Sequence, residues 1–158
     1  MFAILLFLVP VLAFSQSKSP LIGAWKLVSY AHTLPGGEKS YPYGQQPSGL
    51  LVYSENGWMS AQLYNQTHPT KPVAVQSATL PELQRLMRGT AYFGRYTLYA
   101  KEGKVIHHVE RSNRGTSGVD YVRYFKLNGD RLVITVRPED QQVLGRSGTT
   151  ELVWERGR

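Results

Sequence analysis

The sequence predicts an all-β protein, an eight-stranded antiparallel up-and-down barrel with one short helix. Three observations lead to this prediction: eight short β-type runs, glycine-containing turns between them, and a single stretch with a helical pattern. The eight runs cover residues 24–33, 49–54, 58–64, 92–100, 105–112, 119–127, 131–137 and 149–156. Eight strands are enough to close a barrel, and closure removes the exposed edges of an open sheet. A sandwich of two sheets is the alternative.

The turns between the runs carry residues that suit tight hairpins. Asn56-Gly57 and Asn128-Gly129 are Asn-Gly pairs, which readily adopt the positive φ angles of two-residue hairpin turns. The other connections contain glycine at residues 36, 37, 103, 145 and 148. Consecutive runs are therefore expected to pair as antiparallel neighbours.

One helix is predicted, over residues 80–89. Thr79 is its N-cap, Pro81 and Glu82 stand in the first turn, where proline and an acidic residue are favoured, and Gly89 ends it. The preceding residues 65–77 are polar and contain proline, so we expect a loop that folds across one end of the sheet.

The first fifteen residues are typical of a secretory signal peptide. An apolar run from Phe2 to Phe14 is too short to cross a bilayer, and small residues at Ala13 and Ser15 fit a cleavage site after Ser15. An uncleaved membrane anchor is the alternative, because the segment before the run has no lysine or arginine. We therefore expect a signal peptide at residues 1–15, one domain at residues 16–158, a secreted or periplasmic location, and no stable membrane insertion after cleavage.

Composition excludes several classes of function. The absence of cysteine rules out disulfides, a thiolate zinc site and a cysteine nucleophile. The net charge of +7 comes from lysines and arginines that are scattered singly, so we expect no nucleic-acid partner. No phosphate-binding loop or dinucleotide fingerprint is present, and we expect no cofactor.

A series of motifs resembles the bacterial and fungal lipocalin-like domain family. The first is Gly23-Ala24-Trp25, a Gly-x-Trp triplet at the start of the first strand. The others, in order, are residues 41–44, 49–53, 57–63, 91–94, 107–110 and 152–156. The resemblance implies a calycin-type barrel in which Trp25 packs against a basic residue near the end of the barrel, here Arg156. It implies no particular activity.

Two adjacent histidines stand on one predicted strand. His107 and His108 point to opposite faces of that strand, so they cannot readily bind one metal ion together. His108 and Glu110 share a face but lack a third ligand with a spacing signal. We therefore expect no metal site.

A polar site inside the barrel is predicted from the run at residues 119–127. Tyr121, Arg123, Phe125 and Leu127 share a strand face, and the apolar members indicate that this face is buried. A buried arginine needs a carboxylate or an anionic ligand. We expect Glu110 to pair with Arg123, with His108 beside them, although Arg123 could instead reach the barrel rim and pair with exposed acids.

Tyrosines supply the rest of the predicted pocket. A tyrosine buries a ring and offers one hydroxyl, which suits a cavity that orients a mostly apolar ligand. Tyr43, Tyr92 and Tyr96 are the best candidates, since Tyr92 and Tyr96 share a face with Gly94, where a missing side chain leaves room. The predicted ligand-binding residues are Tyr43, Tyr92, Tyr96, His108, Glu110, Arg123 and Phe125.

The sequence thus predicts a protein that binds a small hydrophobic or aromatic molecule. The alternative is a cofactor-free isomerase or cyclase for an unsaturated or polyketide-like substrate. In that enzyme His108 or Glu110 would act as general acid or base, and Arg123 would stabilise a developing negative charge. A structural module of the cell envelope is the third interpretation.

Overall fold

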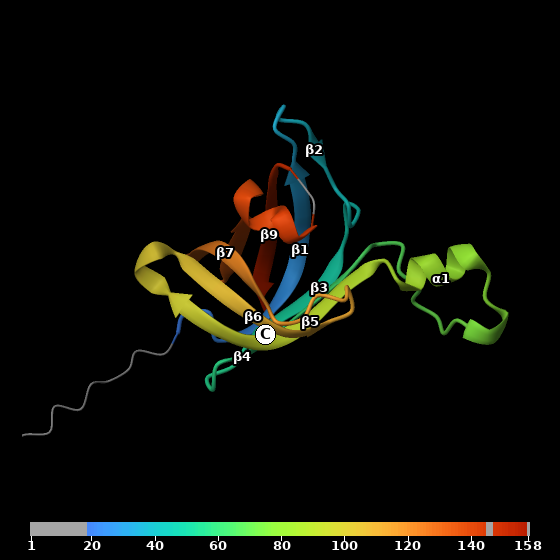
Figure 1. The fold of residues 1–158 in the computed structure, drawn as a ribbon, viewed down its shortest axis with the longest axis horizontal. Helices are drawn as coiled ribbons and strands as arrows, with labels where there is room; N and C mark the ends of the chain where they lie inside the picture. Colours follow the sequence, from blue (N-terminus) through green and yellow to red (C-terminus); the bar gives the residue numbers. More distant parts are fainter. Residues whose placement is uncertain (1–18, 145–146, 158) are drawn as a thin grey trace, which may run out of the picture.

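The chain forms a closed antiparallel β-barrel in the computed structural model, which describes residues 19–144 and 147–157 (Figure 1). Each long strand pairs with its neighbours in the sheet, and pairing of the first with the last closes the barrel. The eight strands that form the wall are β1 (Gly23–Thr33), β3 (Ser48–Tyr53), β4 (Trp58–Tyr64), β5 (Gly89–Tyr99), β6 (Lys104–Ser112), β7 (Val119–Asn128), β8 (Arg131–Val136) and β9 (Thr149–Arg156). The predicted barrel is confirmed, and the sandwich is wrong.

Four short elements were not predicted. Strand β2 (Lys39–Ser40) pairs with the end of β1, and the 3₁₀ turns are η1 (Val75–Ser77), η2 (Ala100–Glu102) and η3 (Pro138–Leu144). Strand β2 spans two residues, η1 and η2 span three residues each, and η3 spans seven. Such short elements contain too few residues to show a period of 2 or 3.6 in the sequence.

Helix α1 (Leu80–Leu86) is shorter than predicted. It begins after Thr79 as expected, and the Glu82 carboxylate accepts hydrogen bonds from the Thr79 N–H at 2.8 Å and hydroxyl at 2.7 Å. It ends three residues early because Gly89 is the first residue of β5, where it pairs with Tyr64. The pairing of β5 with β4 therefore decides where the helix ends, and Gly89 does not act as its stop signal.

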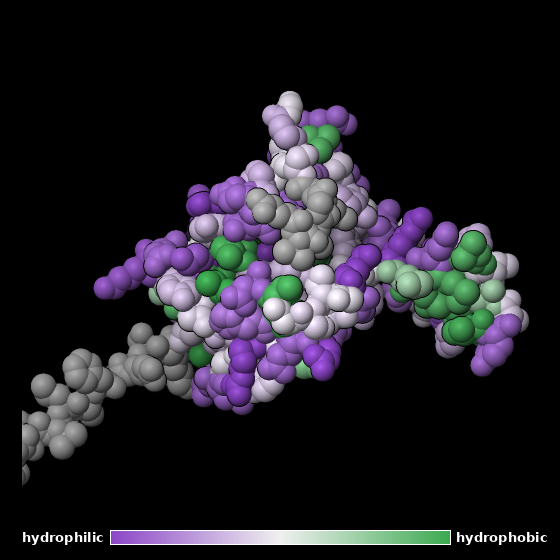
Figure 2. All heavy atoms as spheres, viewed as in Figure 1, coloured by the Kyte–Doolittle hydropathy of each residue, from purple (hydrophilic) through white to green (hydrophobic). Residues whose placement is uncertain are grey.

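The long β4–β5 connection forms an arm that extends away from the barrel (Figure 1). The prediction that residues 65–77 fold across the end of the sheet is wrong. No residue of α1 is buried, and Val75, Leu80 and Met87 are exposed, so apolar side chains gather on the arm in Figure 2. The arm is held by its own helix cap and turns, since few residues connect it to the wall.

The barrel end that holds the start of β1 is closed by a tryptophan and an arginine. Trp25 is fully buried, its Nε1 donates to the Leu21 carbonyl at 2.8 Å, and the Arg156 guanidinium lies 4.1 Å from its ring centroid. Gly23 has a φ of 126°, and Arg156 would lie 3.1 Å from any Cβ added there. The predicted packing of Trp25 against Arg156 is confirmed, and the positive φ favours glycine at position 23.

No helix among the described residues is both long and apolar enough to span a bilayer. The predicted signal peptide and its cleavage after Ser15 lie outside the described residues.

Candidate functional site

The barrel contains a cavity at the end opposite the Trp25–Arg156 contact. Its volume is about 380 Å³, and it is partly open to solvent. It is surrounded by the end of β1, the β2–β3 loop, the end of β4, the start of β5, the β6–β7 loop and η3. The lining residues are Tyr30, Tyr43, Leu63, Thr90, Tyr92, Arg114, Thr116, Tyr121, Arg123, Val136, Gln141, Thr150 and Leu152.

Arg123 lies inside the barrel, as the alternation along β7 predicts. It is 8% exposed, like the neighbouring inward residue Tyr121 at 6%. Its Nη1 donates to the Val122 carbonyl at 2.8 Å, and its guanidinium lies 4.7 Å from the Tyr121 ring centroid. The alternative position at the rim, paired with exposed acids, is wrong. Arg123 forms no ion pair with any carboxylate of the described residues.

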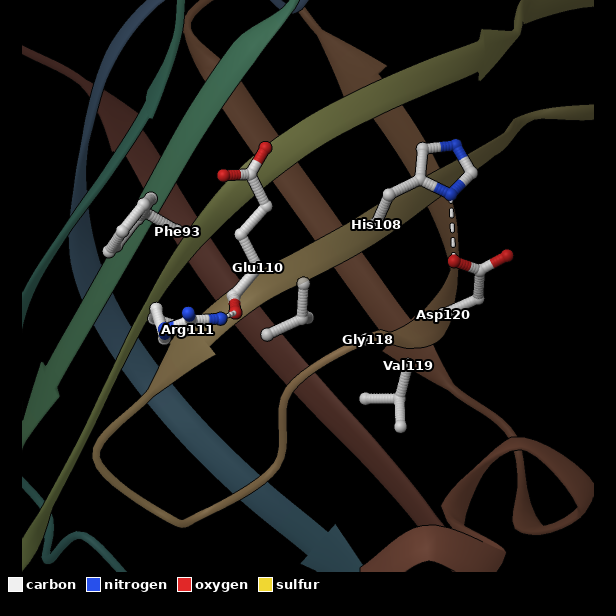
Figure 3. Close-up of a pocket in the computed structure, with 8 residues that line it drawn as sticks. Phe93, His108, Glu110, Arg111, Gly118, Val119 and Asp120 are labelled. Atoms are coloured by element: carbon white, nitrogen blue, oxygen red, sulfur yellow. Dashed lines mark hydrogen bonds and ion pairs between the residues drawn. The ribbon is translucent and has the colours of Figure 1, made fainter.

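The predicted partners of Arg123 are on the outside of the barrel. His108 Nδ1 donates to the exposed Asp120 carboxylate at 2.7 Å, and Glu110 is exposed on the same outer face. Figure 3 shows this shallow outer surface, where His108 and Glu110 project from β6 and only His108 reaches Asp120. The predicted cluster of His108, Glu110 and Arg123 is therefore wrong.

The register of the sheet explains the error. Val105 of β6 pairs directly with Arg123 of β7, and directly opposed residues share a face. The inward residues of β6 are therefore Val105, His107 and Val109, all buried. The two valines that flank His107 at a spacing of two are the signal in the sequence for this face. An ion pair between Glu110 and Arg123 would have required the opposite face of β6 to be inside.

His107 is the interior residue that the sequence analysis missed. It is 1% exposed, and its two ring nitrogens meet the hydroxyls of Tyr53 at 2.6 Å and Tyr92 at 3.0 Å. A neutral imidazole has one donor and one acceptor nitrogen, so one tyrosine donates to the ring and the other accepts from it. Burial, with the charges of Arg123 and then His108, lowers the pKa of His107 well below its usual value. The ring is therefore neutral at pH 7.

The same burial keeps both tyrosines protonated. Burial raises the pKa of Tyr53 well above its usual value and also raises that of Tyr92, where the charge of Arg123 and a hydrogen bond from it oppose the rise. Tyr53, His107 and Tyr92 thus form an uncharged chain of hydrogen bonds that leads from the core to the cavity. It holds the Tyr92 hydroxyl at the cavity wall beside Arg123.

The other predicted tyrosines lie at different depths. Tyr43 lines the cavity from the β2–β3 loop, with its hydroxyl 2.6 Å from the Thr90 hydroxyl. Tyr96 lies deeper, against the Tyr53 ring, and donates to the Ser54 carbonyl. Phe125 packs against the core from the far part of β7. Of the seven predicted ligand-binding residues, Tyr43, Tyr92 and Arg123 therefore lie at this cavity, and their binding role stays a prediction.

Gly94 has a different purpose from the one predicted. A Cβ at this position would lie 2.0 Å from the His108 carbonyl oxygen, at the irregularity in pairing between Phe93 and Gly94. The glycine permits close approach of two backbones and does not make room in the cavity.

The short segment η3 covers part of the cavity mouth. Gln141 is buried, and its amide donates to the Gly148 carbonyl at 2.9 Å and the Val136 carbonyl at 3.4 Å. Thr150 bridges Gln141 to the ring of His32. Beside Gln141, the Asp140 Oδ2 is buried without a hydrogen-bond partner among the described residues. Burial raises the pKa of Asp140, Glu139 raises it further, and the charges of Arg123 and Arg137 oppose the rise.

A search of the described residues finds no group of three or more histidine, aspartate or glutamate side chains that could hold a metal ion. The chemistry available at the cavity is therefore that of its arginines, its hydroxyls and one amide.

Comparison with known proteins identifies the family. A search of the curated proteins finds no significant match. The model of one family, described as a lipocalin-like domain, matches residues 22–157, which is nearly all of the described chain. The match spans the closed barrel, the Trp25–Arg156 contact and the cavity, and the chain belongs to the lipocalin-like domain family.

Proposed function

We propose that this protein binds a small, mostly apolar or aromatic molecule in the barrel cavity. A lipocalin-like barrel indicates small-molecule binding in general. The observation that supports this ligand type is the cavity of about 380 Å³, whose wall contains the rings of four tyrosines. That volume is at the lower end of the range typical of ligand pockets.

The tyrosine rings form two pairs in the cavity wall. The rings of Tyr30 and Tyr43 are 4.6 Å apart, and those of Tyr92 and Tyr121 are 5.4 Å apart in an edge-to-face arrangement. Aromatic faces of this kind favour flat, unsaturated ligands. The hydroxyls at the wall would orient such a ligand.

The alternative enzyme lacks the groups assigned to it. An isomerase or cyclase with His108 or Glu110 as acid or base needs those side chains within reach of the cavity, and both lie on the outer face. Two histidines among the described residues are buried inside the barrel. His107 is already bonded through both ring nitrogens, and His32 is bonded through Nδ1 to the Thr150 hydroxyl. Binding without catalysis is therefore the function that the site supports best.

The test is binding of a neutral, environment-sensitive dye, N-phenyl-1-naphthylamine. We expect one site per chain and a blue-shifted emission. Val136→Phe places a ring in the cavity and should weaken binding at least about tenfold, whereas Val133→Phe, on the outer face of β8, should leave it unchanged. Leu63→Phe is a second filling variant, and circular dichroism verifies the fold of each. Equal binding by all the variants would place the dye outside the cavity and contradict the proposal.

We also propose that the protein is exported and cleaved after Ser15, because the apolar run and the small residues that follow have the spacing of a signal peptide. Intact-mass measurement of the exported protein tests this, with a chain that begins at Gln16 expected. A membrane-bound chain that still begins at Met1 would favour the anchor.

A further inference from the structure

The least compensated charge inside the barrel is that of Arg123. A guanidinium has five N–H donors. Among the described residues, the Arg123 guanidinium donates to the uncharged Val122 carbonyl at 2.8 Å, and the protonated Tyr92 lines the same cavity. Burying a cation without an opposite charge is costly, and an arginine does not lose its proton to escape that cost. The fold therefore leaves this guanidinium available to an anion that enters the cavity.

The groups around Arg123 are mostly positive or neutral. Arg114 lines the cavity at its rim, and on β5 and β6 the side chains that face Arg123 are the protonated Tyr92 and the neutral His107. On η3, Asp140 and its neighbour Glu139 are acidic. The charge of Arg123 acts to lower the pKa of Asp140, although the two side chains form no ion pair.

The geometry matches a carboxylate better than a larger anion. Guanidinium presents paired N–H donors that fit the two oxygens of a carboxylate. One carboxylate neutralises the single buried guanidinium, because Arg114 at the rim is exposed. The Tyr92 hydroxyl lies beside Arg123 at the cavity wall, and the aromatic pairs accept an apolar body.

We propose that the cavity binds an organic monocarboxylate, with the carboxylate on Arg123 and a flat apolar body against the tyrosine rings. This inference rests on the proposed function and specifies the chemical class of its ligand.

The test uses three probes of one shape: 2-naphthoic acid, its neutral amide 2-naphthamide, and 2-naphthyl phosphate. Each is titrated by calorimetry and by displacement of N-phenyl-1-naphthylamine at pH 7. We expect the acid to bind at least about tenfold more tightly than the amide, since a charge-assisted pair is lost in the amide. The phosphate should bind more weakly than the acid.

Arg123→Met should remove the preference for the acid and retain the affinity for the amide. Arg111→Met is a matched control, because the Arg111 Nη1 also donates to the carbonyl of the preceding residue, Glu110, but on the outer face (Figure 3). It removes the same charge from the protein and should preserve the preference. Asp140→Asn removes a competing carboxylate near Arg123 and should strengthen binding of the acid several-fold without changing that of the amide.

The outcomes separate this inference from the function on which it rests. Equal binding of acid and amide, or failure of all three probes to displace a bound dye, overturns the carboxylate and leaves the cavity as a binding site. Tighter binding of the phosphate also overturns the monocarboxylate. If Arg111→Met abolishes the preference as fully as Arg123→Met, the effect comes from net charge alone and the inference is wrong. Absence of dye binding to the wild-type protein contradicts the proposed function itself.

Discussion

The two ends of the barrel each contain an arginine against an aromatic ring, but only one of the two is paired by the protein. At the closed end, Arg156 lies over Trp25, donates to the Ile22 carbonyl at 3.0 Å and the Pro20 carbonyl at 3.3 Å, and contacts Asp130 at 3.3 Å. At the open end, Arg123 lies over Tyr121 with a single backbone carbonyl as its closest acceptor.

This difference separates a structural arginine from a functional one. Arg156 is partly exposed and gains carbonyls, a carboxylate and an indole face from the fold, so its interactions serve stability. Arg123 is almost fully buried and gains no charge partner, so its position costs stability that a ligand would recover. Residue type and aromatic contact are the same, and the partners alone distinguish the two roles.

The largest expected effect comes from removing each arginine in turn. Arg156→Met should lower the free energy of unfolding by about 2 kcal/mol, because hydrogen bonds from a charged group are lost and two carbonyls lose a donor. Arg123→Met should leave the free energy of unfolding unchanged or raise it, because an apolar side chain replaces an unpaired buried charge. Urea denaturation at pH 7 measures both. A loss of more than about 1 kcal/mol in Arg123→Met would show that the fold depends on Arg123 as much as on Arg156.

A second expected effect concerns the boundary between the dry core and the cavity, where His107 lies. The unfolded chain takes up a proton at histidine near pH 6.5, whereas folded His107, with its lowered pKa, stays neutral. The stability that neutral His107 contributes is therefore present above pH 6.5 and is lost as the pH falls toward the folded pKa. Between pH 7.5 and 5.5, the free energy of unfolding should fall by roughly 1 kcal/mol more in the wild-type protein than in His107→Gln.

Urea denaturation across this pH range provides the measurement, and His108→Gln, on the outer face of the same strand, is the control. If His107→Gln and the wild-type protein show the same pH dependence, water from the cavity reaches the ring and the core begins deeper than Val105 and Val109.

The smallest expected effect compares the two buried tryptophans near the closed end. Trp25 Nε1 donates to the Leu21 carbonyl, whereas Trp154 Nε1 is buried without a partner among the described residues. Both substitutions to phenylalanine lose similar apolar contact, but only Trp25→Phe strands a carbonyl. Trp25→Phe should cost about 1 kcal/mol more than Trp154→Phe. Thermal unfolding measures the difference, and equal costs would show that the Trp25 hydrogen bond adds nothing to the closed end.

Most of the barrel wall could be predicted because its signals are local. Strands β6 and β7 begin within one residue of their predicted starts, and the turns at Asn56-Gly57 and Asn128-Gly129 lie where glycine and asparagine place them. The packing of Trp25 against Arg156 was implied by the resemblance to the lipocalin-like family, and the structure has it. The inward face of β7 followed from alternation, since Phe125 and Leu127 are apolar.

The path of the arm and the C-terminal end of its helix could not be predicted in this way. Proline and polar residues at 65–77 indicate a loop but contain no information on its direction. Gly89 reads locally as a helix stop, and it became a strand residue because Tyr64 of β4 was available to pair with it.

The sequence by itself determined the eight strands of the wall and the inward face of β7, because each depends on patterns within a few residues. Only the tertiary structure decided what surrounds Arg123. The side chains of β6 alternate between the two faces, and a shift of one residue in register would exchange His107 for His108 inside the barrel. The pairing of Val105 with Arg123 fixes that choice, since it turns His107 inward and places Glu110 in solvent, and the buried charge is left without a carboxylate.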